Sequence, residues 1–363
     1  MKSSGIGGQA VMEGIMMRNG NKYSVGVRRP DKKIQLKIED YKSITGKSKI
    51  LKLPFIRGIF NFIDSMVVGM KCLDYSSGVY ISDEEEEETE PGKFEKAMTK
   101  MFGDKAEKVL TTFIMILSIV LAIGIFALLP AFFGSLLHKV IENHYIVSLL
   151  EGLIRLTIFI LYVWLISFLN DIKRTYMYHG AEHKCINCVE HGLPLTIENV
   201  KGSSRFHKRC GTSFLLIVMI ISILLFMVID ARTIWIKFLS RIALIPVVAG
   251  ISYEFLRLAG NSDNCIINLL SKPGLCLQRI TTSEPDETMI EVAIAAVEAV
   301  FDWREYESVN NGLNKEELTG IEAVTSEIVI DDGHLDDENA EEEKEDQGGD
   351  STAKEADETV KET

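Results

Sequence analysis

Several features that mark common classes of protein are missing from this sequence of 363 residues. Its first residues, MKSSGIGGQAVMEG, hold no apolar core of signal-peptide length, so we expect the N-terminus to be retained. The sequence has no internal repeat of solenoid length, no Walker loop and no dinucleotide-binding fingerprint. These absences argue against a cleaved secretory protein, a repeat scaffold and a nucleotide-dependent enzyme.

Charged residues are missing from long parts of the chain. Residues 111–137 contain none, and about 20 apolar residues are enough for a helix to cross the hydrocarbon core of a bilayer. Three more apolar stretches follow, at 146–169, 213–230 and 234–258. The expected fold class is therefore an α-helical polytopic membrane protein with about four transmembrane helices.

The fourth stretch is the least regular. Lys237, Arg241 and Glu254 interrupt it and Pro246 can kink it, so three spans plus an interfacial helix remain an alternative. A carboxylate within a span is costly unless it is paired or functional. Arg257 lies one turn after Glu254, and we favour an interfacial ion pair between them over a functional role for Glu254.

Acidic residues are concentrated at the C-terminal end. Residues 308–363 contain 19 Asp/Glu and four Lys/Arg, a formal charge of −15, against −13 for the whole chain. The remainder of the chain is thus slightly basic. The tail has few aromatic residues and dense acid, a composition that predicts disorder.

Basic residues indicate the orientation in the membrane. Residues 1–74 contain 14 Lys/Arg and the connection at 170–212 contains seven, whereas the link at 138–145 contains one. The positive-inside rule predicts a multi-pass protein of the cell membrane with cytoplasmic N- and C-termini. The predicted partner is the lipid bilayer. Topology and anionic lipids explain the basic charge, so no nucleic acid is expected.

The sequence divides into five parts. These are an N-terminal cytoplasmic unit at 1–82, an acidic linker at 83–92, a membrane domain at 93–260 with a cytoplasmic His/Cys loop at 170–212, a cytoplasmic C-terminal segment at 261–307, and a disordered acidic tail at 308–363.

Local patterns predict the structure of the soluble parts. Two alternating runs, 23–28 and 33–38, flank Pro30 and Asp31 and predict a β-hairpin, and the apolar spacing at 53–75 predicts an amphipathic helix. Residues 269–282 are expected to be irregular around Pro273-Gly274. A further amphipathic helix is predicted from Pro285 to about residue 306.

The chemistry is concentrated between the second and third apolar stretches. Residues 179–210 hold four of the seven histidines and three of the six cysteines. His179 and His183 are one helical turn apart with Glu182 beside them, the order in which two histidines ligate zinc and the glutamate acts as a general base toward water. His207 and Cys210 offer a third ligand.

The spacing leaves the type of site open. Three ligands and a vacant position are typical of catalytic zinc, and four protein ligands of structural zinc. Cys185, Cys188 and His191, with His183, His207 and Cys210, could form a closed site. A third interpretation is that the histidines line the membrane interface and the cysteines pack as small residues. Because the loop is assigned to the reducing cytosol, no disulfide framework is expected.

Four phrases carry a resemblance to a known family. GGQAVMEGIMMR, YHGAEHK, HKRCGTSF and LQRITTSEPDE, spread over residues 5 to about 302, resemble the signatures of the YqhQ family, uncharacterised bacterial multi-pass membrane proteins described as predicted metal-dependent enzymes. The motif positions that this resemblance implies are Gln9, Glu13, Arg18, His179, Glu182, His183, His207, Arg209 and Cys210. The chain departs from the pattern at Lys208, where the family often has proline.

The resemblance strengthens the hypothesis that Glu13 contributes to the metal site. From the sequence alone, Glu13 is interpreted as a surface carboxylate in a glycine-rich turn. The expected function is a zinc-dependent hydrolase acting on a membrane-protein or lipid-linked substrate. Its catalytic residues would be Glu182 and Glu13, and a divalent metal, zinc by ligand type, would be held by His179, His183, His207 and Cys210. The alternative is a non-enzymatic membrane scaffold or assembly factor with a structural metal site.

Overall fold

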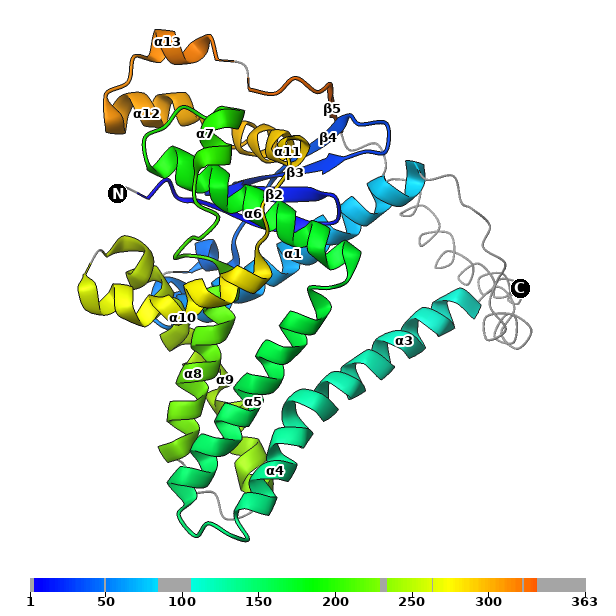
Figure 1. Cartoon of the computed structure of the whole chain (residues 1–363), viewed down its shortest axis with the longest axis vertical. Coiled ribbons are helices and arrows are strands. Elements are labelled where there is room, and N and C mark those ends of the chain that lie inside the picture. Colours follow the sequence, from blue (N-terminus) through cyan, green and yellow to red (C-terminus); the bar gives the residue numbers. More distant parts are fainter. Residues whose placement is uncertain are drawn as a thin grey trace, which may run out of the picture.

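A computed structural model describes residues 3–48, 50–83, 106–228, 234–262, 264–321 and 323–331 of the chain. A β-sheet unit covered by helices occupies one end of the molecule, and long apolar helices occupy the other (Figure 1). Helix α6 (Asn170–Glu190) lies between the two ends, and it carries the histidines that the sequence singled out.

The sheet has five strands in the order β1-β2-β3-β4-β5. The first four pair in antiparallel fashion, and β5 pairs with β4 in parallel. The strands are β1 (Ile6–Val11), β2 (Gly14–Asn19), β3 (Lys22–Arg28), β4 (Ile34–Asp40) and β5 (Ile328–Ile330). The predicted hairpin is β3–β4. The two strands before it were missed because their glycines weaken the alternating pattern.

Helices cover both faces of the sheet. Tyr23 and Val25 of β3 pack in one apolar cluster with Val68 of α1 (Ile56–Asp83), the amphipathic helix predicted at 53–75. On the opposite face, Ser24 donates from Oγ to the carbonyl of Ala296 in α11 (Glu287–Glu298) at 2.6 Å. Successive residues of a strand point to opposite faces, so a strand covered twice is buried along its length.

Within the described residues, four helices are long and apolar enough to cross a membrane. They span Thr112–Leu137, His144–Ile166, Gly211–Val228 and Leu239–Gly260. The first joins α3 (Ala106–Ile123), a π-helical turn η4 (Gly124–Leu128) and α4 (Leu129–Leu137), and the others belong to α5 (His144–Ile166), α8 (Gly211–Val228) and α9 (Ile234–Asn261). Helix α3 leans away from α5, α8 and α9 (Figure 1). The link that contains Arg232 lies outside the described residues.

Glu254 has a different partner from the one predicted. Arg57 of α1 donates from Nε to the Glu254 carboxylate at 2.7 Å, and Asn61 donates to the hydroxyl of Tyr253 at 2.7 Å. The expected interfacial ion pair is therefore made with α1, whereas the prediction named Arg257 on the same helix. Periodicity identifies the buried face of a helix but not the element that covers it.

The segment predicted to be irregular at 269–282 is instead part of helix α10 (Cys265–Thr281), which includes Pro273. Its buried residues Ser271, Gly274, Gln278 and Thr281 recur every three or four positions, so amphipathic packing prevails over the Pro-Gly turn signal. A Cβ on Gly274 would lie 2.8 Å from Cβ of Ser213, so the glycine allows α10 to approach α8 closely.

The chain remains structured beyond residue 308, where the sequence predicted a disordered tail. Helices α12 (Trp303–Asn311) and α13 (Lys315–Thr319) follow, and β5 completes the sheet. The carboxylate of Glu291 holds this segment, since it accepts from the amide of Thr325 at 3.2 Å and lies 3.1 Å from Nη2 of Arg28. Residues 332–363, and the acidic linker after Asp83, lie outside the described residues.

Candidate metal centre

The conspicuous histidines gather where the sheet unit meets the apolar helices. His179 and His183 lie one turn apart on α6, with ring centroids 4.4 Å apart. Cys210 directly precedes α8. The donor atoms of these three side chains all lie within 4.8 Å of one another, and we call them the His/Cys cluster.

Backbone carbonyls fix the orientation of both imidazoles. Nδ1 of His179 lies 2.9 Å from the carbonyl oxygen of Thr281, and Nδ1 of His183 lies 2.7 Å from that of Arg205. A carbonyl only accepts hydrogen bonds, so each Nδ1 donates; in the neutral form of the ring, the form that binds a metal, each Nε2 then presents a lone pair. Metal-binding histidines characteristically hold their second ring nitrogen in this way.

The free ring nitrogens face the cysteine. Nε2 of His179 lies 3.2 Å from Sγ of Cys210, which also accepts from the amide of Thr212 at 3.4 Å. Nε2 of His183 is buried and has no hydrogen-bond partner among the described residues. Two imidazole nitrogens and one sulfur therefore converge on a single point, a donor set that suits zinc and leaves a fourth position for water or substrate.

Glu182 lies beside the cluster against strand β1. The residue is 5% exposed, and its Oε2 has no hydrogen-bond partner in the part of the chain that the structure describes. Burial raises the pKa of Glu182 to about 7, although the His179 charge and the Gly8 amide oppose the shift. A Cβ on Gly8 would lie 2.8 Å from Cγ of Glu182, so glycine is needed for this approach.

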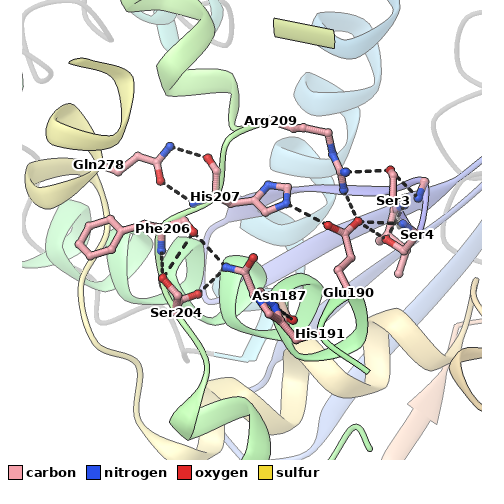
Figure 2. A network of polar contacts seen from close by, with 12 residues as sticks. Ser3, Ser4, Asn187, Glu190, His191, Ser204, Phe206, His207, Arg209 and Gln278 are labelled. Atoms are coloured by element: carbon pink, nitrogen blue, oxygen red, sulfur yellow. Dashed lines mark hydrogen bonds and ion pairs between the residues drawn. The ribbon is translucent and has the colours of Figure 1, made fainter. Parts of the chain in front are cut away.

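Buried side chains hold the loop that connects α7 (Ile197–Gly202) to α8. Lys184 donates from Nζ to the carbonyl of Ser203 at 2.9 Å, and Asn187 donates to that of Phe206 at 3.0 Å. Gln278 accepts from the amide of His207 at 2.9 Å and donates to its carbonyl at 2.8 Å (Figure 2). The loop that supplies the Arg205 carbonyl is thereby fixed.

A second polar group, formed around Glu190, is shown in Figure 2, and it adjoins the cluster through His207, whose ring centroid is 5.8 Å from that of His183. Glu190, on α6, has a fully buried side chain that pairs with Arg209 and accepts from the amide of Ser4 at 2.8 Å. Nε2 of His207 lies 3.5 Å from its Oε2. Burial alone would raise the pKa of Glu190, but His207 and Arg209 outweigh it and lower the pKa to about 2.

Known proteins resemble this chain over most of its length. Residues 53–303 match the family described as "Protein of unknown function (DUF1385)". Over 289 residues the chain is 37% identical to the uncharacterized protein YqhQ of Bacillus subtilis (strain 168), covering 79% of this chain and 89% of that protein. The chain therefore belongs to the DUF1385 family. No solved structure matches it.

The matched family region contains all three residues of the His/Cys cluster. Of the four predicted ligands, the structure brings together His179, His183 and Cys210. His207 lies next to them, with its ring centroid 5.8 Å from that of His183, but its Nε2 is directed toward Glu190. Burial lowers the pKa of His207, and Glu190 opposes that shift.

Glu13, the second predicted catalytic residue, precedes the region that the family model matches. It lies in the β1–β2 turn with a positive φ of 47°. Its carboxylate pairs with Arg174 of α6 and lies 3.4 Å from the hydroxyl of Tyr178. The structure therefore places Glu13 in an ion pair that joins the turn to α6, separate from the His/Cys cluster.

The residues of the closed arrangement are not brought together. Cys185 belongs to the apolar core, and Cys188 directs Sγ to the carbonyls of Leu193 and Pro194. His191 lies at the end of α6, with Nδ1 2.6 Å from the carbonyl of Asn187. All six cysteines are free.

Sequence reasoning missed several residues that support the cluster. Glu190 was detectable, because it lies seven positions after His183 and therefore on the same face of α6. Thr281 and Gln278 come from α10, 102 residues after His179 and 71 residues after His207, respectively. No periodic signal links them to the histidines, and only the phrase LQRITTSEPDE, which contains both, pointed to this segment.

Proposed function

We propose that the chain is an integral protein of the cell membrane with four spans and with both termini in the cytoplasm. Four apolar helices of sufficient length support the span count. The β4–β5 pairing supports it independently, because strands that precede and follow all the spans must lie on one side of the membrane. That condition requires an even number of crossings. The basic residues of 1–74 and 170–212 support a cytoplasmic location for this side.

The same proposal assigns a divalent metal, with zinc preferred, to His179, His183 and Cys210. The observation that carries it is the pair of Nδ1–H donors held by backbone carbonyls, which directs both Nε2 atoms toward the cysteine sulfur. Zinc accepts imidazole and thiolate ligands at comparable distances, and nitrogen and sulfur together disfavour magnesium and calcium.

The chemistry that this arrangement suits is hydrolysis. When bound with an open position, such a metal acidifies water and polarises the bond to be cleaved. Glu182 lies next to His183 with a free Oε2, where it would accept a proton from water and return it to the leaving group. Cys210 directly precedes α8, so the centre is at the depth where a membrane-protein segment or a lipid-linked group emerges. We propose a substrate of this membrane-associated kind.

A structural role is the second candidate, and one observation favours it. His183 and Cys210 are buried, and the cluster joins α6, below the sheet, to the start of α8. A metal there would staple the sheet unit to the spans of a scaffold or assembly factor.

One experiment tests the bound metal that both functions require. Metal content of the detergent-purified full chain is measured by elemental mass spectrometry for wild type, Glu182→Gln, the double variant His179→Ala/His183→Ala, and His191→Ala as a matched histidine control. We expect near-stoichiometric zinc in all except the double variant. Absence of metal from gently purified wild type would overturn both functions.

Function in cells then distinguishes catalysis from stapling. A catalytic centre predicts that Glu182→Gln keeps its metal and its abundance but loses the activity that complements a deletion strain. A staple predicts that Glu182→Gln complements normally, whereas His183→Ala and Cys210→Ala lower the abundance of the protein.

A further inference from the structure

Three charged residues meet inside the bundle of apolar helices, remote from the His/Cys cluster. Glu151 of α5 is 2% exposed, and its Oε1 accepts from Arg241 of α9 at 2.6 Å and from Arg155 at 3.4 Å. All three residues lie within candidate spans. Charged side chains in such positions are rare and are functional candidates by default.

All four candidate spans contribute to this place. Gly134 of α4 approaches so closely that a Cβ there would lie 2.9 Å from Oε2 of Glu151. Phe226 of α8 lies under the guanidinium of Arg241, with its ring centroid 5.4 Å from Cζ. The triad is therefore fixed by packing between the helices, unlike an ion pair on a flexible surface.

The charges of the triad do not balance. Two guanidinium groups share one carboxylate, so these residues carry a net charge of +1 among apolar helices. An unbalanced charge among apolar helices is unfavourable, and an anionic ligand would remove that cost. Each guanidinium presents five N–H donors, whereas the contacts to Glu151 use one nitrogen of each arginine. Within the described residues, donors therefore remain for oxygen atoms of a ligand.

The arginine side chains are accessible to such a ligand. Those of Arg155 and Arg241 are 18% and 25% exposed, while Glu151 beneath them is covered. Guanidinium pairs match the geometry of phosphate oxygens, which they bind with two hydrogen bonds each. We propose that Arg155 and Arg241 bind a phosphate group in the half of the bundle nearer the α4–α5 connection.

The site is distinct from the His/Cys cluster and does not depend on a metal. Phe226 and Cys210 are 16 positions apart along α8, about 24 Å at 1.5 Å per residue. Arg241 is the third residue of its span, Leu239–Gly260, and helix α9 begins at the end of the bundle opposite the sheet unit (Figure 1). Its guanidinium is therefore within reach of the headgroup region on that side. A phospholipid headgroup can supply the phosphate from there, and a free phosphate ion can supply it from water.

The test uses delipidated full-length protein in neutral detergent and native mass spectrometry. Three probes are titrated separately: dioleoyl phosphatidylglycerol, dioleoylglycerol, which lacks the phosphate, and inorganic phosphate. Arg155→Gln is the informative variant, because it leaves a neutral Glu151–Arg241 pair that remains compatible with folding. Lys139→Gln, an exposed cation in the α4–α5 connection, is the matched control.

We expect wild type and Lys139→Gln to retain phosphatidylglycerol but not dioleoylglycerol. Arg155→Gln should bind the phosphate probe roughly tenfold more weakly or worse, since hydrogen bonds to a charged group are lost. Glu151→Gln, which removes the competing carboxylate, should retain binding. Binding of phosphatidylglycerol alone identifies a lipid site, and binding of inorganic phosphate as well identifies a site open to water. Equal binding of the phosphate probes by wild type and Arg155→Gln, or no binding by wild type, overturns the proposal and leaves a structural ion triad.

Discussion

Gly8 and Glu182 are so close that a methyl group on the glycine would lie 2.8 Å from Cγ of the glutamate and 2.8 Å from the Met16 carbonyl. Strand β1 therefore contacts the candidate centre through its backbone. Replacing Gly8 by alanine forces β1 and α6 apart.

We expect Gly8→Ala to lower the free energy of unfolding by about 1–3 kcal/mol, as overpacking of a close contact does. Gly7→Ala is the matched control, because a Cβ there meets nothing within 4 Å and should change stability by less than about 0.5 kcal/mol. Thermal unfolding of the two variants in the same detergent measures the difference. Equal midpoints would show that β1 does not press on Glu182.

Acid should weaken the group around Glu190. The pKa of this carboxyl is about 2 when folded, below its ordinary value of 4.5, because His207 and Arg209 outweigh the effect of burial. A lowered pKa contributes stability above the ordinary value, and this stability is lost as the pH falls toward about 2. The gap in melting temperature between wild type and Glu190→Gln should therefore be wide at pH 6 and narrower at pH 3. A gap independent of pH would contradict the assigned ion pair.

Metal removal should destabilise the protein only when the ligands are present. Saturating zinc at 100 times its dissociation constant contributes about 2.7 kcal/mol, which corresponds to a melting shift of roughly 5 °C or more for a chain of this size. Chelation should lower the melting temperature of wild type and of His191→Ala by that amount. The double variant His179→Ala/His183→Ala should not respond. An equal response in all three would assign the effect to metal bound elsewhere.

The segment that ends in β5 should loosen when Glu291 is changed. Its carboxylate accepts from the hydroxyls of Thr325 and Ser326, both at 2.5 Å. In Glu291→Ala, hydrogen exchange of residues 323–331 should accelerate at least about tenfold while β1–β3 stay protected, because the amide of Thr325 and the hydroxyls of Thr325 and Ser326 lose their shared acceptor. Glu287→Ala, which removes an exposed ion pair between the same helix and Lys201, is the control. Unchanged exchange in Glu291→Ala would mean that the pairing with β4 and the contacts of Arg28 and Tyr75 are enough to secure the segment.

Local signals predicted the elements that are continuous in sequence. The apolar stretches yielded four helices of membrane length, and the Pro30-Asp31 turn yielded the β3–β4 hairpin. The spacing of His179 and His183 correctly put both rings on one side of α6. Each of these depends on residues a few positions apart, which periodicity describes directly.

Features that join distant segments could not be predicted in this way. Arg57 forms the hydrogen-bonded ion pair with Glu254 because α1 packs on α9, and Thr281 orients His179 because the end of α10 contacts α6. Helix α10 itself was missed because the Pro-Gly pair reads as a turn until the α8 surface that it packs against is known. The disordered tail was predicted to begin too early in the chain, because a strand as short as β5, with three residues, leaves little alternating pattern in the sequence.

The sheet unit is assembled from both ends of the chain, and this arrangement sets an order for its biogenesis. The ribosome releases β1–β4 first, but α11, which covers one face of these strands, emerges only after more than 240 further residues, including every apolar helix, have been synthesised. One apolar face of the sheet is therefore exposed while the intervening helices are synthesised and inserted into the membrane by the translocon. Chaperones that shield exposed strands during this interval should affect the yield of this protein more than that of a membrane protein whose soluble unit is continuous in sequence.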